Sequence, residues 1–172
     1  PEDYVLLKAP NVIMTPQGTM NYVVNVIGSQ GPVVGALVEV VFTAAADPLT
    51  CWCPGQVHPT ITAITDPAGD AVFTIEGGLC IDPVRLGGTA VEVFANGIKL
   101  AEVGAVSPDA VDAGGTLPPA AVVGPPCSVG LSDATFHTPS ISSGTYEFCT
   151  DINSDGGVDL TDTTWDLTGP ER

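Results

Sequence analysis

Basic side chains are scarce in this sequence. Four Lys and Arg residues stand against 20 Asp and Glu, which gives a formal net charge of −16 over 172 residues. The four are Lys8, Arg85, Lys99 and Arg172. A surface of this charge repels nucleic acid and anionic lipid, so neither is an expected partner. It attracts divalent cations instead.

Long apolar runs and catalytic signatures are also missing. No run reaches the roughly 20 apolar residues of a membrane span. The sequence holds no G-x-S-x-G, H-E-x-x-H or glycine-rich phosphate loop. The two histidines, His58 and His137, stand in loop-like stretches beside proline or threonine, and Asp66 and Asp70 fit turn capping better than acid–base work. We therefore expect no enzyme.

The composition is that of a folded and exported chain. It is 44% hydrophobic and only 14% charged, which excludes disorder and gives room for one domain or two small ones. Five cysteines favour an oxidising compartment, and we expect secretion to the cell surface or beyond. The start at Pro1 is either an artificial boundary or the mature end left after a signal peptide.

The cysteines suggest a partial disulfide map. They are Cys51, Cys53, Cys80, Cys127 and Cys149. We expect Cys127 to pair locally with Cys149, and Cys80 with Cys51 or Cys53, since C-x-C pairs seldom bridge each other. The cysteine left over is either free and buried or bonded to another subunit. A zinc site from Cys51, Cys53 and His58 lacks a second ligand pair and is disfavoured.

The first 106 residues are predicted to form strands and turns, with no helical period. β-Branched or apolar runs indicate strands at 5–7, 11–14, 19–27, 36–43, 60–65, 71–75, 89–95 and 98–106. The loop 44–59 is expected to be irregular. Asn96-Gly97 is a strong hairpin signal, and the turn Asp66-Pro-Ala-Gly-Asp70 is expected to close another hairpin. Short strands at this spacing predict a β-sandwich.

Three segments carry a family resemblance. They are Gly35-Ala-Leu-Val-Glu-Val, Thr65-Asp-Pro-Ala-Gly-Asp-Ala-Val-Phe and Gly87-Gly-Thr-Ala-Val-Glu-Val-Phe-Ala. Together they resemble a bacterial immunoglobulin-like domain over roughly 95 residues. The resemblance implies a β-sandwich that serves as a spacer or assembly module in surface proteins. The antibody-type Cys…Trp…Cys spacing is absent.

The strongest sign of chemistry lies near the end of the sequence. Residues 151–162 match a calcium-binding loop, with Gly156 at the sharp turn of position 6 and the apolar Val158 at position 8. Calcium is the expected cofactor. An Asp at position 12, where a longer Glu is usual, predicts a static structural site. The predicted ligands are Asp151, Asn153, Asp155, Gly157 through its carbonyl, Asp159 and Asp162.

The second half of this loop is repeated upstream. Val129-Gly-Leu-Ser-Asp-Ala-Thr-Phe136 matches Val158-Asp-Leu-Thr-Asp-Thr-Thr-Trp165, with a shared V-x-L-[ST]-D-x-T-aromatic pattern. We interpret the first copy as a loop that an insertion near 114–128 has split, followed by a short helix. Asp109, Asp112 and Asp133 would then form a weaker second site.

Paired loop–helix repeats of this form resemble the dockerin domain. Dockerins fold on calcium with two D-x-N-x-D-G loops, and they dock secreted bacterial proteins onto cohesin domains. The chain departs from that pattern in its interrupted first loop, its short helices and its cysteines. The resemblance implies a dockerin-like calcium-binding module over 107–172, after an Ig-like β-sandwich over 1–106.

From these parts we expect a secreted bacterial structural protein. It would self-assemble head-to-tail into a calcium-stabilised extracellular fibre or surface layer, with the N-terminal strand or the segment 117–123 as a contact. Its partner would be a second copy of itself. The many Ser and Thr residues would also allow O-linked glycan. The alternative function is attachment of an Ig-like spacer to a cohesin-type receptor at the cell surface.

Overall fold

The chain is mainly β. A computed structural model describes residues 5–6, 11–16, 20–78, 80–109, 131–143, 145–146, 148–152, 157–159 and 162. The strands are β1 (Val5–Leu6), β2 (Val12–Ile13), β3 (Asn21–Gly28), β4 (Gly31–Pro32), β5 (Leu37–Phe42), β6 (Cys51–Trp52), β7 (Thr60–Ile64), β8 (Asp70–Thr74), β9 (Gly77–Gly78), β10 (Val91–Ala95), β11 (Ile98–Val103) and β12 (Ala105–Val106). The helices are the 3-10 turn η1 (Asp47–Leu49), α1 (Pro83–Leu86) and α2 (Leu131–Ser143).

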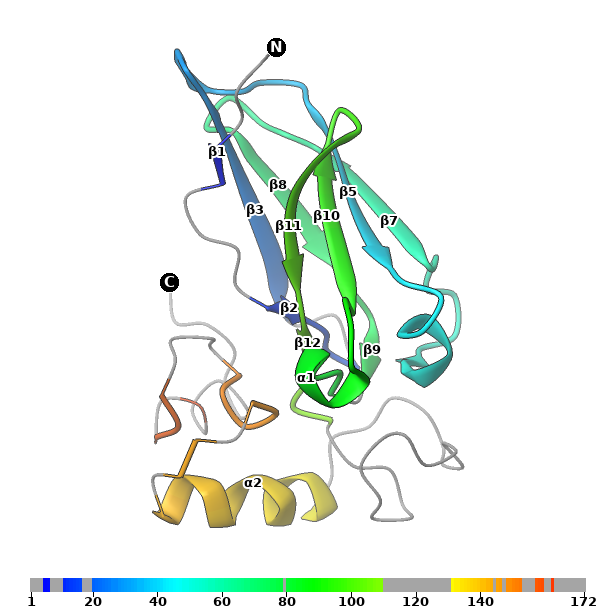
Figure 1. Ribbon diagram of the computed structural model, residues 1–172, viewed down its shortest axis with the longest axis vertical. Coiled ribbons are helices and arrows are strands. Elements are labelled where there is room, and N and C mark those ends of the chain that lie inside the picture. Colours follow the sequence, from blue (N-terminus) through cyan, green and yellow to red (C-terminus); the bar gives the residue numbers. More distant parts are fainter. Residues whose placement is uncertain are drawn as a thin grey trace.

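Two four-stranded sheets form the body of the molecule (Figure 1). In one, β3 pairs with β1, β4 and β8, and in the other the order is β11-β10-β5-β7. The pairs within these sheets are antiparallel. Two short ladders extend the body, β2 parallel to β12 and β6 antiparallel to β9.

Alternating side chains build one apolar core between the sheets. Along β5 the inward residues are apolar and buried, and the same holds along β3 and β10. The inward set from these strands is Tyr22, Val24, Val26, Val38, Val40, Phe42, Val91, Val93 and Ala95. Because successive side chains of a strand point to opposite faces, these residues share the inner faces of their strands.

Two turns show how local chemistry directs the chain. Asn96 and Gly97 have positive φ values of 47° and 76° and join β10 to β11, so the predicted hairpin is confirmed. The turn from Asp66 to Asp70 also forms, with the Asp66 N–H donating to the Asp70 carbonyl at 2.9 Å. However, β7 pairs with β5 and β8 pairs with β3, so this turn crosses between sheets and the predicted hairpin is wrong.

The strand predicted over 98–106 is interrupted at Gly104. A Cβ at this position would overlap the ring of Phe148 and lie 2.9 Å from Pro83 Cδ. The chain beyond Gly104 leaves β10 and runs beside β2 as β12. The single-strand prediction is therefore wrong, because a contact from far along the chain requires a glycine here.

Short elements lie in the loop predicted to be irregular and between the predicted strands. The 44–59 loop contains η1 and β6. Helix α1 starts at the N-cap Asp82, whose carboxylate accepts the Val84 N–H at 2.8 Å, and ends at Gly87 in the left-handed region. None of the described helices is long and apolar enough to cross a membrane.

Residues 148–149 lie at one end of the sheets. A second apolar cluster joins Ile13 of β2, Val106 of β12 and Met20, which precedes β3, to Cys149 and Phe148. In Figure 1, α2 and this segment lie at the end opposite to the β10–β11 hairpin. The β10–β11 hairpin and α2 therefore mark the two ends of the molecule.

Candidate metal centre

The two ends of the predicted calcium loop are buried. Asp151, at position 1, is 2% exposed, and Asp162, at position 12, is 1% exposed. Burying a carboxylate is costly unless hydrogen-bond donors or a cation compensate its charge. These two acidic groups therefore belong to an environment built to stabilise negative charge.

Asp162 closes the loop through backbone hydrogen bonds. Its Oδ1 accepts the N–H of Ile152 at 2.9 Å, and its Oδ2 accepts the N–H of Asp159 at 2.9 Å. Position 12 therefore returns to position 2, as a loop that surrounds a cation requires. Each oxygen of an ionised carboxylate keeps a further lone pair after one such bond.

The remaining loop positions are only partly described. Gly157 is half-buried, Val158 is buried and Asp159 is exposed, while the predicted ligands Asn153 and Asp155 lie outside the described residues. No three His, Cys, Asp or Glu side chains gather into a metal-binding group within the described ranges. The calcium site at 151–162 thus stays a prediction. The residues present fit such a site, since Asp151 and Asp162 are buried carboxylates and Asp162 accepts two backbone N–H groups of the loop.

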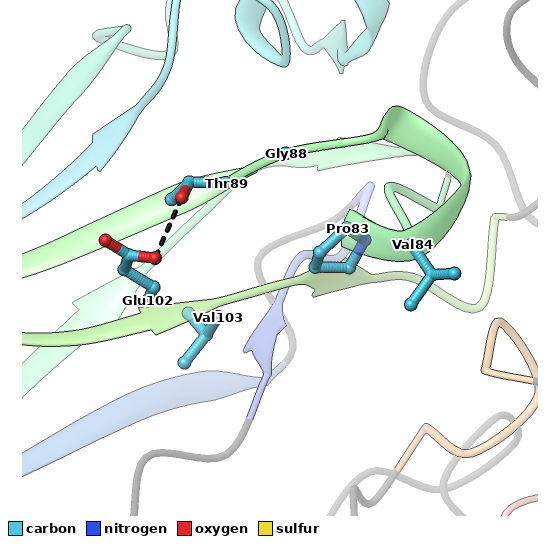
Figure 2. A pocket seen from close by; sticks show the side chains of 6 residues that line it. All are labelled: Pro83, Val84, Gly88, Thr89, Glu102 and Val103. Atoms are coloured by element: carbon cyan, nitrogen blue, oxygen red, sulfur yellow. Dashed lines mark hydrogen bonds between the residues drawn. The ribbon is translucent and has the colours of Figure 1, made fainter.

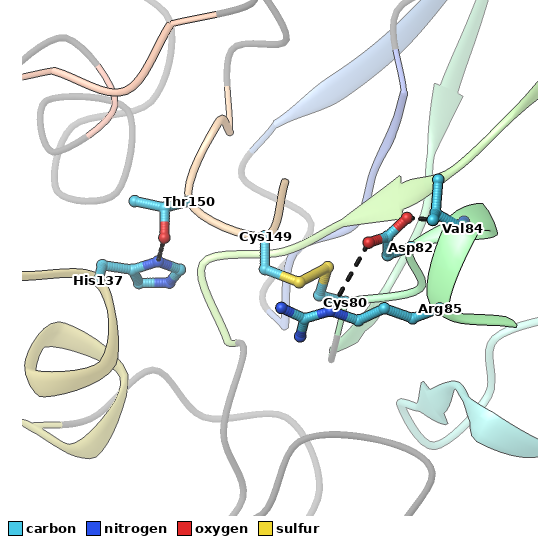
Figure 3. The surroundings of a disulfide bond; sticks show 7 residues. All are labelled: Cys80, Asp82, Val84, Arg85, His137, Cys149 and Thr150. Atoms are coloured by element: carbon cyan, nitrogen blue, oxygen red, sulfur yellow. Dashed lines mark hydrogen bonds and ion pairs between the residues drawn. A yellow bond between two sulfur atoms is a disulfide. The ribbon is translucent and has the colours of Figure 1, made fainter. Parts of the chain in front are cut away.

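Helix α2 contacts the residue that precedes the loop. His137 is 1% exposed, and its Nδ1 lies 3.3 Å from the Thr150 hydroxyl (Figure 3). Thr150 is itself fully buried. This contact connects the helix that begins within the first repeat to the start of the second loop.

A disulfide fastens the same segment to the sheets. Cys80, which follows β9, is bonded to Cys149, which stands two positions before Asp151 (Figure 3). The predicted pairing of Cys127 with Cys149, and that of Cys80 with Cys51 or Cys53, are therefore wrong. The reason is that the apolar cluster around Val106 and Phe148 brings a distant segment onto Cys80, which local spacing could not reveal.

The other described cysteines have different states. Cys53 is also disulfide-bonded, whereas Cys51 is buried and takes no part in a disulfide. A disulfide removes the thiolate that zinc needs, and His58 Nδ1 is 2.8 Å from Asp47 Oδ1. The disfavoured zinc alternative gains no support from this geometry.

Asp109 is the described member of the weaker second site. It is 2% exposed, and a Cβ on Gly78 would lie 2.6 Å from its Oδ2, so β9 leaves space for this carboxylate only because residue 78 is glycine. The Asp109 N–H donates to the Ser107 hydroxyl at 3.1 Å. Asp112 and the side chain of Asp133 lie outside the described residues, so the second site also stays a prediction.

A separate aromatic cluster surrounds β6. The Trp52 ring stacks on His58 with centroids 4.8 Å apart and meets Phe42 edge-on at 4.7 Å. The Trp52 Nε1–H donates to Asp47 Oδ1 at 2.9 Å. The Asp47 carboxylate thus binds both the Trp52 ring and the His58 ring. These contacts hold the 44–59 loop against the core.

One pocket opens between α1 and the β10–β11 pair. It has a volume of about 400 Å³ and is lined by Pro83, Val84, Gly88, Thr89, Glu102 and Val103 (Figure 2). Glu102 accepts the Thr89 hydroxyl at 2.9 Å and also binds Lys99. Both oxygens of the Glu102 carboxylate are thus engaged within the protein.

Comparison with known proteins gives no match, whether to a family model, a curated protein or a solved structure. The resemblances to immunoglobulin-like and dockerin domains therefore rest on the sequence motifs alone. Sequence reasoning had no signal for the contact between His137 and Thr150 or for the space that Gly78 gives Asp109. Both depend on segments that meet only in the folded chain.

Proposed function

We propose that this chain is a secreted bacterial structural protein that assembles head-to-tail into a calcium-stabilised extracellular fibre or surface layer. Its sheets would serve as an immunoglobulin-like spacer, and residues 107–172 as a calcium-clamped module. The observation that carries the proposal is the chemical difference between the two ends of the long molecule.

One end exposes apolar side chains, which we call the apolar rim: Val34, Leu37, Ile64 and Ile98. They are 62%, 40%, 59% and 44% exposed. Leu37 faces Ile64 across the β5–β7 ladder, and the Leu37 carbonyl accepts the Asn96 N–H at the hairpin that leads into Ile98. Clustered exposed apolar groups are typical of a surface that another molecule covers.

The opposite end also exposes Val84 of α1, but unlike the apolar rim it contains buried acidic groups and is covalently held. The Cys80–Cys149 disulfide and the contact of Phe148 with Gly104 hold the C-terminal segment there. It contains the buried carboxylates Asp151 and Asp162. Calcium in this segment would fix its shape and reduce the repulsion between chains of charge −16.

Two unlike ends favour an open assembly. When a surface at one end of a subunit binds a different surface at the other end, the contact repeats and forms a filament unless the rotation closes a ring. The apolar rim and the disulfide-held end are such a pair of unlike surfaces. Calcium dependence follows because the loop beginning at Asp151 belongs to one of them.

The test is light scattering and negative-stain microscopy of the full chain, with calcium and with a chelator. We expect filaments in calcium and their loss in chelator. Val34→Lys places a charge in the apolar rim and should prevent filaments, whereas Val23→Lys, on the outer face of β3, should leave them unchanged. A monodisperse 17.5 kDa species in calcium would refute the proposal.

The second candidate function is attachment to a cohesin-type receptor. It is favoured by α2, which begins inside the first V-x-L-[ST]-D repeat and has 13 residues. The first repeat therefore continues into a full helix. A pull-down of the intact chain against cohesin-type domains, with and without calcium, separates the two candidates. Calcium-dependent capture by such a domain would favour attachment, and filaments of the chain alone would favour assembly.

A further inference from the structure

Strand β7 is an edge strand of its sheet. Within the part of the chain that the structure describes, β5 is the strand that pairs with it. The Phe42 N–H donates to the Pro59 carbonyl at 2.9 Å, and the Thr65 N–H donates to the Ala36 carbonyl at 3.0 Å. Since hydrogen-bonding residues alternate along an antiparallel strand, Ile61 and Ala63 direct their backbone groups toward β5.

The alternate residues of β7 direct their backbone groups away from β5. These are Thr60, Thr62 and Ile64, whose N–H and C=O groups face outward along the edge. The side chains of Ile61 and Ala63 pack on the core, whereas Thr62 and Ile64 are exposed. The edge therefore offers a row of donors and acceptors together with uncharged side chains.

The two edges of this sheet differ in how they are protected. Proteins protect a free edge with charges, prolines or bulges that prevent pairing with another chain. Edge strand β11 carries Lys99 and Glu102, and its ladder with β10 has a register shift at Val93/Phe94. Strand β7 reads Thr-Ile-Thr-Ala-Ile, with neither a charge nor a proline inside it.

We propose that β7 pairs antiparallel with β7 of a second copy of this chain. Pairing centred on Thr62 places Thr62 opposite Thr62 of the second copy, and Thr60 opposite its Ile64. All of these residues direct backbone groups outward, so each pair exchanges two hydrogen bonds. The sheet would continue across the contact as β11-β10-β5-β7 followed by the same strands in reverse order.

The occupant is a second copy because the edge complements itself. Thr opposite Thr, and Thr opposite the β-branched Ile, are favourable cross-strand pairs. Two chains of charge −16 repel each other over most of their surface, and β7 lets them meet without placing acid against acid. The contact is isologous, so it joins two chains laterally and does not extend them. It does not depend on calcium, and of the apolar rim it uses only Ile64, which belongs to β7.

A charge-swap experiment tests this register. We expect the full chain in chelator to have a mass of about 35 kDa, twice the 17.5 kDa of one chain. Thr62→Lys and Thr62→Glu should each give monomers, because like charges would then face each other across the two-fold axis. An equimolar mixture of these variants should restore the 35 kDa species as a heterodimer. Val23→Lys is the matched control and should stay dimeric.

Circular dichroism checks that each variant is folded, and amide hydrogen exchange gives a second measurement. In the wild-type chain the outward N–H groups of Thr60, Thr62 and Ile64 should exchange slowly, and in Thr62→Lys they should exchange fast while Ile61 stays protected. A wild-type monomer in chelator, or a mixture that stays monomeric, would overturn the proposal. Loss of filaments in Val34→Lys with dimers retained would show that the two contacts are separate.

Discussion

Asp162 and Ile152, ten positions apart, are joined by a hydrogen bond from the Ile152 N–H to the Asp162 carboxylate at 2.9 Å. Ile152 is itself buried at 1% exposure, so this bond lies away from water. The same carboxylate holds the N–H of Asp159. One side chain thus shapes both halves of the predicted calcium loop.

Asp162→Ala should weaken the loop in two ways. It leaves the buried N–H of Ile152 without its acceptor, which costs about 1–3 kcal/mol of stability, and it removes a predicted calcium ligand. We expect a lower melting temperature even in chelator, and weaker calcium binding by isothermal titration calorimetry. Asp159→Asn changes an exposed carboxylate and should reduce stability less. An unchanged melting temperature in Asp162→Ala would contradict the role given to this carboxylate.

The Cys80–Cys149 disulfide should couple to calcium. The bond closes a separation of 69 residues, and chain-entropy arguments give such a loop about 4 kcal/mol of stabilisation. Replacing both cysteines by alanine should lower thermal stability and weaken calcium binding, since Asp151 follows Cys149 by two positions. By reciprocity, calcium should shift the thiol–disulfide equilibrium toward the bonded form, measured by thiol labelling after equilibration in redox buffers. Equal reduced fractions with and without calcium would count against a site at 151–162.

Gly104 should tolerate no larger residue. A Cβ there would meet Phe148, Pro83 and the Ile81 carbonyl, so Gly104→Ala should destabilise the fold by about 1–3 kcal/mol in chemical denaturation. Gly88→Ala is the matched control, because no atom lies within 4 Å of its added Cβ. Combining Gly104→Ala with Phe148→Ala should cost less than the sum of the two changes, since the overlap with the ring is then gone.

Local chemistry explains which parts of the fold could be predicted. The strands predicted over 36–43 and 89–95 and the turn at Asn96-Gly97 depend on neighbouring residues, and the structure confirms them as β5, β10 and their hairpin. Helix α1 also has a local signal in Asp82-Pro83 and Gly87, although no helix is predicted within the first 106 residues.

The errors concern contacts between distant segments. The turn at Asp66–Asp70 looks the same whether it joins two strands of one sheet or crosses between sheets. The partner of Cys80 depends on Phe148 packing against Gly104, which no spacing of cysteines reveals. For the calcium loop, the motif predicts a full ligand set. Among the described residues, the structure gives the burial of Asp151 and Asp162 and the two backbone hydrogen bonds that Asp162 accepts.

Tyr22 should make stability depend on pH under alkaline conditions. Its side chain is buried in the core beside Phe73, with ring centroids 6.1 Å apart, and burial raises the pKa of its hydroxyl well above the ordinary value. In the unfolded chain this tyrosine ionises near pH 10, whereas in the folded chain it stays protonated to higher pH. Its contribution to stability is therefore complete below about pH 10 and is lost as the pH rises further, by up to about 1.4 kcal/mol per pH unit. Denaturant unfolding between pH 9 and 11 should show this loss, and Tyr22→Phe should reduce the slope. Equal slopes in the two proteins would mean that the folded chain does not hold this hydroxyl in its neutral form.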